Sequence, residues 1–372
     1  MMPIKRRARI NIDKMRVSLS QPKDLFGNLN KYIQEQKEKK KGVKADKKMV
    51  VVSFADFDLL IKDDGTSQHS DKPSIKIIAD VILTDGSVLG EFTFNNSAKY
   101  DGLCFFTFSN AALYSGQNTL YGDGQTTWQT YLMEVANTLG LTVNTQTEVE
   151  LAIDVNFNPI PHLRSLIKDV EHYDMIYNNK CVVDPDRTLD NYGEYFGRSR
   201  RRLHKYPTLY FSQKDREGLS LKCYDKSREI AEESLKQYIK VYDDFGDKRK
   251  IFRFEFTVKW KQFQRWLENI EIDDSMPSEW RKANGESDTD HLERSQSLLM
   301  TDAYKCALWQ FCADRLLYFR HKMTKEFVSL FDIVAEGTDL EKFSMATDTP
   351  FVVDDTIVVE EPEFVDDVDF MG

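Results

Sequence analysis

The sequence predicts an α+β protein: a largely antiparallel sheet with helices on one face, followed by a helical extension and an acidic tail. Two observations lead to this fold class. From Met49 onwards, short runs rich in β-branched and aromatic residues alternate with turn signals such as Asp85-Gly86, which is typical of antiparallel hairpins. Between Pro277 and Pro350 there is no proline, and apolar residues recur at steps of three and four, which is typical of helices.

The predicted elements begin with strands in the runs MVVVSFADFDLLI, IKIIADVIL, SVLGEFTF and GLCFFTF. A helix follows over TTWQTYLMEVANTLG, because Trp128 and Leu132 share one face and Gly140 ends it. A strand over Glu148–Phe157 and a helix after Pro161 come next. The pattern therefore mixes strands and helices from the start of this region.

The second half continues with the strands TLYF and LSLKCY, a helix over Ser227–Tyr242 and the strand Ile251–Trp260. A long amphipathic helix is then predicted, because one apolar stripe continues at helical spacing. Its members are Tyr304, Leu308, Cys312, Leu316, Phe319, Met323, Phe327 and Leu330.

The charge of the chain is unevenly distributed. The total of 51 Lys+Arg against 61 Asp+Glu gives a formal charge of −10, which argues against nucleic-acid binding. However, residues 331–372 contain thirteen acidic residues and one lysine, whereas residues 1–48 contain fifteen basic and five acidic residues. We therefore expect four segments. These are a basic N-terminal arm (1–48), an α+β core (49–270), a helical extension (271–330) and an acidic tail that is disordered or docks a partner (331–372).

Several classes of protein are disfavoured. No apolar run approaches the roughly 20 residues that span a bilayer, and no apolar segment follows the basic N-terminus. The five cysteines show no CxxC spacing, which favours reduced thiols and a cytoplasmic location. The sequence contains no P-loop, GxGxxG or HExxH motif, and its six histidines are isolated from one another, which disfavours a histidine-based metal site.

Three predicted strands carry charged residues on one face and apolar residues on the other. They are the strand over Glu148–Phe157, the strand LSLKCY and the strand over Ile251–Trp260. If they share a sheet, Glu150, Asp154 and Glu255 could bind Mg²⁺ or Mn²⁺, since these ions prefer oxygen ligands. Glu150 and Asp154 are about 13 Å apart at Cα along one strand, so only one of the two is expected to touch the ion. The alternative is a solvated face whose charges pair across strands.

The strand LSLKCYDK adds a candidate nucleophile, Tyr224, on the same face as Lys222 and Lys226. A free tyrosine has a pKa of about 10 and is a poor nucleophile at neutral pH. Two neighbouring ammonium groups would favour the phenolate, and a metal would polarise a phosphodiester. The pattern therefore points to attack on a phosphodiester.

The order of these motifs resembles the Rep_trans (replication initiation factor) family of rolling-circle plasmid replication initiators. Each family motif has a counterpart between Glu148 and Lys259, about a third of the chain. Glu150 replaces the first aspartate of the family strand, and Lys222 replaces an arginine. The matching runs are Glu150-Leu151-Ala152-Ile153-Asp154, Thr208-Leu209-Tyr210-Phe211, Lys222-Cys223-Tyr224-Asp225-Lys226 and Arg253-Phe254-Glu255.

The resemblance implies an HUH-nickase-like core that binds and nicks replication-origin DNA. Tyr224 would attack a phosphodiester, giving a 5′-phosphotyrosyl link and a free 3′-OH, while Lys226 and Arg253 would contact phosphate or the phenolate. Glu150, Asp154 and Glu255 would hold Mg²⁺ or Mn²⁺. Partners would be locally single-stranded origin DNA, a host helicase and a polymerase, with a homodimer left open. A mobilisation relaxase and a non-catalytic DNA-binding replication accessory protein are the alternatives.

A cluster of basic residues precedes the strand that carries Tyr224. In the run GRSRRRLHK, a turn-like link concentrates positive charge, which predicts contacts with the DNA backbone or the origin. The alternative is a solvated loop. Together with Lys222, the predicted DNA-binding residues are Arg198, Arg200, Arg201, Arg202 and Lys205.

Overall fold

The computed structural model describes residues 5–39, 50–63, 66–67, 74–96, 102–115, 128–187, 194–195, 208–212, 219–231, 250–287, 290–291, 294, 298–299 and 301–345. A twelve-stranded sheet dominates it, and the pairings between its strands are antiparallel. Its order is β11 (Glu194–Tyr195), β12 (Leu209–Ser212), β13 (Leu219–Asp225), β14 (Phe252–Lys259), β8 (Thr142–Val155), β1 (Ala8–Ser20), β7 (Leu103–Phe108), β6 (Val88–Asn95), β5 (Ser74–Leu83), β3 (Phe57–Asp63) and β2 (Val50–Ser53), with β4 (Thr66–Ser67) paired to β5.

A smaller sheet and several helices complete the fold. The smaller sheet has the order β10 (Lys180–Val182), β9 (Tyr173–Tyr177), β15 (Leu317–His321) and β16 (Phe327–Ser329). The α-helices are α1 (Lys23–Lys39), α2 (Asn110–Ser115), α3 (Trp128–Leu139), α4 (Ile160–Lys168), α6 (Lys226–Glu229), α7 (Trp260–Ile272), α9 (Asp302–Leu316) and α10 (Leu330–Ala335), and the 3-10 turns are η6 (Ser278–Trp280) and η7 (Glu341–Phe343). The predicted α+β class with a largely antiparallel sheet is confirmed.

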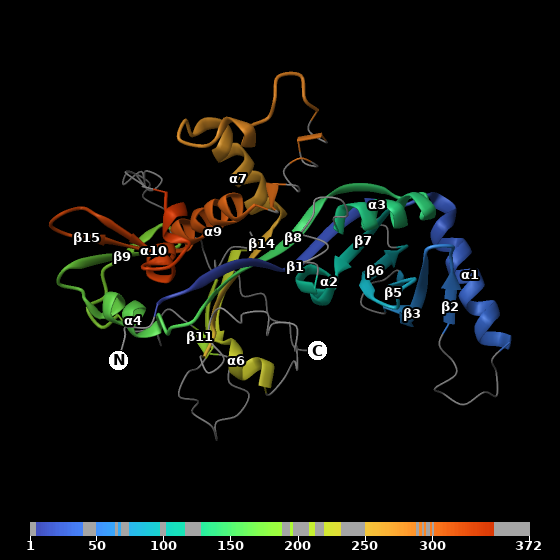
Figure 1. The fold of residues 1–372 in the computed structure, drawn as a ribbon, viewed down its shortest axis with the longest axis horizontal. Coiled ribbons are helices and arrows are strands. Elements are labelled where there is room, and N and C mark those ends of the chain that lie inside the picture. Colours follow the sequence, from blue (N-terminus) through green and yellow to red (C-terminus); the bar gives the residue numbers. More distant parts are fainter. Residues whose placement is uncertain are drawn as a thin grey trace, which may run out of the picture.

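The two long strands β1 and β8 lie side by side across the middle of the molecule (Figure 1). Their register pairs Arg9 with Asp154 and Lys14 with Glu150. Strands β14 to β11 extend the sheet from β8, and strands β7 to β2 extend it from β1. The two halves of the molecule therefore share a pair of strands, and polar residues of β1 are brought beside those of β8 and β14.

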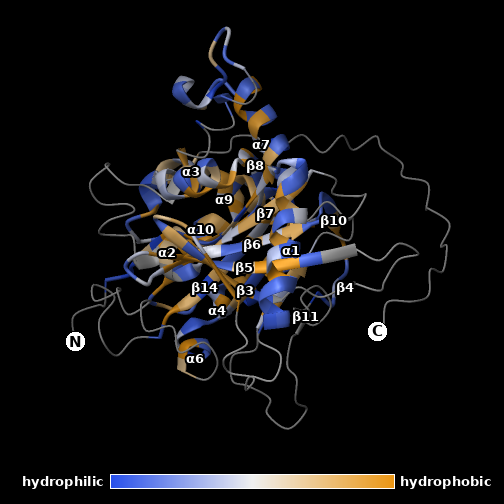
Figure 2. Ribbon diagram, turned by 90° about the vertical axis from the view of Figure 1, so that its right-hand side faces the viewer, coloured by the Kyte–Doolittle hydropathy of each residue, from blue (hydrophilic) through white to orange (hydrophobic). Residues whose placement is uncertain are grey.

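The apolar face of the sheet is covered by helices. Phe252, Phe254 and Phe256 of β14 are buried, and the ring of Trp309 in α9 lies 4.9 Å from that of Phe256. In the other half, the buried Phe26 belongs to α1. Hydrophobic residues are prominent in the strands labelled β14 and β3 (Figure 2). Because one face is packed in this way, the polar residues of β13, β14 and β8 are left on the opposite face.

The predicted basic arm over 1–48 is wrong for most of that segment. Ala8–Ser20 forms the central strand β1, and Lys23–Lys39 forms α1. Apolar residues of β1 such as Ile10, Ile12 and Met15 are buried in the core. The net positive charge of the segment concealed this alternation of buried and polar residues.

The predicted helix through Leu330 is also shorter than expected. Helix α9 ends at Leu316, and the chain continues directly into the extended strand β15. Met323, which was placed on the buried stripe, is 84% exposed. The run Leu317–His321 is rich in aromatic residues and pairs with β9 and β16, so strand pairing overrides the helical spacing.

Two further boundaries differ from the prediction. The expected acidic tail from residue 331 begins inside the core, because Phe331 and Val334 of α10 are buried. Residues 346–372 lie outside the described residues, as does most of the helix predicted over Ser227–Tyr242, of which α6 is the described start. Among the helices in the described ranges, none combines the length and apolar character that crossing a membrane requires.

Candidate metal and tyrosine site

The candidate site lies on the polar face of the sheet, where β13, β14, β8 and β1 are neighbours. The register places Lys222 opposite Glu255 and Tyr224 opposite Arg253. On the next pair of strands, Arg253 is opposite Asp154. The three charged strands identified in the sequence therefore do share one sheet, and the structure brings their polar faces together.

Three carboxylates from three strands converge at this site. One oxygen each of Asp13, Glu150 and Glu255 lies within 4.8 Å of the others, and we name these residues the carboxylate group. Asp13 belongs to β1, where the pairing with β8 slips between Ile12 and Lys14. Such a β-bulge changes the direction of a side chain and is common beside functional sites. The bulge accounts for the burial of Asp13 directly after the buried Ile12.

Asp13 was missed by the sequence analysis, because it lies in the segment predicted to be an arm. A signal was present in the run ARINIDKMRVSLS, whose apolar residues alternate on either side of this aspartate. The run has the pattern of a strand with a polar face, but its pairing with β8, more than 120 residues later, has no local signature.

Asp154, a predicted metal ligand, lies beside the carboxylate group and bonds to Arg253. Its two oxygens accept hydrogen bonds from Nε and Nη2 of Arg253, both at 2.7 Å. Nη1 of the same guanidinium lies 2.5 Å from Oδ1 of Asp13 and 3.7 Å from Oε2 of Glu255. The side chains of Arg253 and Asp154 are both 0% exposed. The pair forms a buried support beneath the carboxylate group.

Tyr224 is half-buried, and its hydroxyl donates a hydrogen bond to Oε2 of Glu255 at 3.2 Å. Burial and the nearby Glu255 carboxylate raise the pKa of Tyr224 well above its ordinary value of 10.0. The expectation that Lys222 and Lys226 would favour the phenolate is therefore wrong for the protein without bound ions. Burial is the largest cause, and the carboxylates of Glu255, Asp13 and Asp154 add to it against the opposing effect of the Arg253 guanidinium.

The two lysines are engaged by acids. Nζ of Lys222 lies 3.1 Å from Glu255 and 4.0 Å from Glu150. Burial alone would lower the pKa of Lys222. The two carboxylates together raise it by more than burial lowers it, so the pKa of Lys222 lies above its ordinary value. Lys226 is not on the strand with Tyr224, because β13 ends at Asp225 and α6 begins. Its buried Nζ pairs with Glu229 at 2.8 Å and lies 5.6 Å from the centre of the Tyr224 ring.

The donor set suits a hard divalent cation. Burial, followed by the charge of Glu255, raises the pKa of Glu150 to about 7, while Lys222 and Lys14 act to lower it. The carboxylate group and Asp154 together gather four carboxylates, and Arg253 and Lys222 form ion pairs with them. Closely spaced carboxylate oxygens of this kind fit Mg²⁺ or Mn²⁺.

Comparisons with known proteins give one structural similarity. No protein-family model matches the sequence. No curated protein matches it either. The fold is similar to a solved rolling circle replication initiator protein from Geobacillus stearothermophilus. That match has 10% sequence identity and a TM-score of 0.38, and it covers 86% of this chain and 89% of the other.

The predicted DNA-binding cluster cannot be placed beside this site. Arg198, Arg200, Arg201, Arg202 and Lys205 lie outside the described residues. Lys222 is the one member of the predicted DNA-binding set that the described ranges include, and it lies at the carboxylate group.

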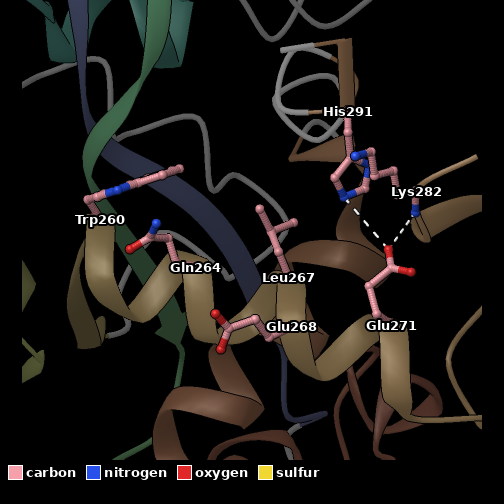
Figure 3. Close-up of a pocket in the computed structure, with 7 residues that line it drawn as sticks. All are labelled: Trp260, Gln264, Leu267, Glu268, Glu271, Lys282 and His291. Atoms are coloured by element: carbon pink, nitrogen blue, oxygen red, sulfur yellow. Dashed lines mark hydrogen bonds and ion pairs between the residues drawn. The ribbon is translucent and has the colours of Figure 1, made fainter. Parts of the chain in front are cut away.

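A separate hollow of about 320 Å³ lies along α7 (Figure 3). One of its glutamates, Glu271, already has polar partners. Its Oε1 accepts a hydrogen bond from the backbone N–H of Lys282 at 2.5 Å and lies 4.0 Å from Nε2 of His291. Burial lowers the pKa of His291, which favours its neutral form at neutral pH. Its described lining includes two glutamates but no tyrosine beside a group of three carboxylates, so the polar sheet face is the stronger candidate site.

Proposed function

We propose that this protein is a metal-dependent DNA-nicking enzyme that initiates rolling-circle replication, with Tyr224 as its nucleophile. The observation that carries the proposal is the hydrogen bond from the Tyr224 hydroxyl to Glu255. Because Glu255 belongs to the carboxylate group, one residue joins the nucleophile to the oxygens that suit a divalent ion. The order of the sequence motifs favours an initiator among the enzymes that could use this chemistry.

The proposed step begins with Tyr224 attacking phosphorus in the origin strand. Glu255 accepts the phenolic proton as the bond between Oη and phosphorus forms. The bond between phosphorus and the 3′ oxygen breaks, and that oxygen takes a proton from solvent. The products are a 5′-phosphotyrosyl link to the protein and a free 3′-OH that a polymerase can extend.

Asp13, Glu150 and Glu255 would hold the Mg²⁺ or Mn²⁺ ion. When bound, such an ion polarises the phosphodiester and offsets the carboxylate charge that opposes ionisation of Tyr224. Asp13 takes the place that the sequence analysis gave to Asp154, because both Asp154 oxygens bond to Arg253. A need for this ion explains how a phenol with a raised pKa can act near neutral pH.

The two lysines would have different roles. Lys222 is 38% exposed, so it can exchange its carboxylate contacts for a DNA phosphate as the strand binds. Lys226 is buried against the Tyr224 ring and fixes the position of the phenol. A half-buried phenol on a sheet surface requires the DNA backbone to lie against that surface, which favours locally single-stranded origin DNA.

A second candidate is a DNA-binding replication accessory protein without nicking activity. The raised pKa of Tyr224 favours it, because a protonated phenol is a weak nucleophile. Both candidates predict DNA binding, but only the enzyme predicts a covalent product.

The test is relaxation of supercoiled origin plasmid with Mn²⁺, followed by separation of the products under denaturing conditions. We expect relaxed plasmid with protein attached to the DNA, no activity in excess chelator, and loss of both products in Tyr224→Phe. Tyr210→Phe is the matched control, because Tyr210 is half-buried on the adjacent strand β12, opposite Lys222. Binding by the wild-type protein without nicking or adduct would overturn the enzyme and support the accessory protein.

A further inference from the structure

The guanidinium of Arg253 occupies a position that DNA cannot reach. Its side chain is 0% exposed, and it lies beneath the carboxylate group between β1, β8 and β14. The motif resemblance implied that this arginine contacts phosphate or the phenolate. A phosphate contact would require the guanidinium to be open to the sheet surface, and the observed packing leaves it enclosed.

The contacts of Arg253 instead point inward and to the side. Two parallel hydrogen bonds to Asp154, both at 2.7 Å, fix the plane of the guanidinium. The remaining terminal nitrogen, Nη1, then faces Oδ1 of Asp13 at 2.5 Å and Oε2 of Glu255 at 3.7 Å. One side chain therefore touches two of the three members of the carboxylate group.

We propose that Arg253 is a positioning residue, anchored by Asp154, that holds Asp13 and Glu255 in the arrangement needed for ion binding. This inference rests on the proposed function, because it assumes that the carboxylate group binds a divalent ion.

Two physical arguments support this assignment. Only a planar fork can bond Asp154 through two nitrogens while presenting a third to Asp13, and a lysine ammonium cannot reproduce that geometry. The charge also matters, because Asp13 and Glu255 repel each other and a fixed cation between them lowers the free energy of holding both ionised. Groups that orient metal ligands in this way commonly change metal affinity by about 10–100-fold.

Arg253 also links segments that are distant along the chain. Asp13 precedes it by 240 residues, and Asp154 precedes it by 99 residues. The second oxygen of Asp13, Oδ2, accepts a hydrogen bond from Asn110 in α2 at 3.4 Å. Asp13 is therefore held from both sides, and Arg253 provides the shorter and charged contact.

The test is calorimetric titration of the folded protein with Mn²⁺ in the absence of DNA, together with DNA binding measured in excess chelator. For Arg253→Lys we expect Mn²⁺ affinity to fall at least tenfold, with DNA affinity in chelator within about twofold of wild type. Arg320→Lys is the matched control, because Arg320 forms a half-buried ion pair with Asp174 in the smaller sheet, away from the carboxylate group. It should leave both measurements unchanged.

Each other outcome has a distinct meaning. Unchanged Mn²⁺ affinity in Arg253→Lys, or a loss of DNA affinity in chelator, overturns the positioning role while leaving the proposed function intact. No Mn²⁺ binding by the wild-type protein overturns the proposed metal site and this inference together. If Arg253→Lys does not fold, Asp154→Asn replaces it, since it keeps the side-chain shape but weakens the anchor. Unchanged Mn²⁺ affinity in a folded Asp154→Asn protein also overturns the proposal.

Discussion

The hydroxyl of Tyr224 donates a hydrogen bond to Oε2 of Glu255 at 3.2 Å, and the other oxygen of Glu255 accepts one from Lys222 at 3.1 Å. Glu255 is thus the residue at which the candidate nucleophile, the half-buried Lys222 and the carboxylate group meet. It also contributes to the raised pKa of Tyr224. The same carboxylate would therefore oppose ionisation without a metal and accept the proton in its presence.

Glu255→Gln is predicted to slow single-turnover nicking by about 10²–10⁴-fold, the usual contribution of a general base. In the protein without metal, the same change should lower the pKa of Tyr224, because it removes a neighbouring negative charge. Ultraviolet difference titration against Tyr224→Phe measures that pKa. The control is Glu148→Gln, which alters an acid of β8 that pairs with Lys14. Equal effects of the two variants would contradict the role of Glu255.

Asp13→Asn is predicted to weaken Mn²⁺ binding at least tenfold, because it removes a charged ligand from the carboxylate group. Titration calorimetry measures this effect, and the same variant should require more Mn²⁺ for nicking. Asp58→Asn, a change in the half-buried aspartate of β3, is the control. Normal Mn²⁺ affinity in Asp13→Asn would show that Asp13 is not a ligand.

A buried carboxyl in α9 predicts that stability depends on pH. Asp314 is 7% exposed, its Oδ1 has no hydrogen-bond partner among the described residues, and burial together with the charge of Asp332 raises its pKa to about 8. A carboxyl whose pKa is higher in the folded state binds its proton more tightly there. Its contribution to stability is therefore full below pH 4 and is lost as the pH rises through 8.

Between pH 5 and 8, the free energy of unfolding of the wild-type protein should fall by a few kcal/mol more than that of Asp314→Asn. Urea unfolding at the two pH values measures the difference, and the variant should be the more stable protein at pH 8. The exposed Asp56 provides the control variant, Asp56→Asn. Parallel pH profiles for wild type and Asp314→Asn would contradict the assignment.

The N-terminal basic residues pair with acids near the other end of the described chain. Arg6 contacts Glu336 at 2.8 Å, and Arg7 contacts Asp339 at 2.8 Å. Lys5 lies 3.7 Å from the same aspartate. We therefore expect Glu336 and Asp339 to compete with DNA phosphates for these basic side chains.

The double change Glu336→Gln and Asp339→Asn is predicted to strengthen non-specific DNA binding at low salt, with the gain disappearing at high salt. Since the pairs are exposed, the free energy of unfolding should fall by only about 1 kcal/mol. Fluorescence anisotropy over a salt series measures the binding. Asp174→Asn, which breaks the remote, half-buried pair with Arg320, is the control. Unchanged DNA affinity at low salt would argue against competition.

The sequence predicted those residues of the site that can be recognised from the pattern of their own strand. Alternating charged and apolar residues in three strands placed Lys222, Tyr224 and Glu255 on polar faces, and strand pairing brought them together. The pattern did not show that Arg253 and Asp154 are buried. Alternation assigns a face to a residue, but burial on that face depends on strands that are distant in the sequence.

The other differences between the prediction and the structure also arise from pairing between strands that are distant in the sequence. Asp13 reaches the site only through long-range pairing of β1 and a bulge, and the high charge of its segment obscured the strand. The boundary between α9 and β15 was missed because the run after Leu316 fits both a helical stripe and an alternating strand. Pairing with β9 decides between them, and that contact is not local.

The proposed function depends above all on a covalent bond between Tyr224 and DNA. The most direct measurement is mass spectrometry of protease fragments after reaction with a single-stranded origin oligonucleotide and Mn²⁺. The proposed mechanism predicts a nucleotide attached through a 5′-phosphate to the peptide containing Tyr224, with an adduct-free protein in Tyr224→Phe. A nick without an adduct, or an adduct on another residue such as Tyr210, would contradict it.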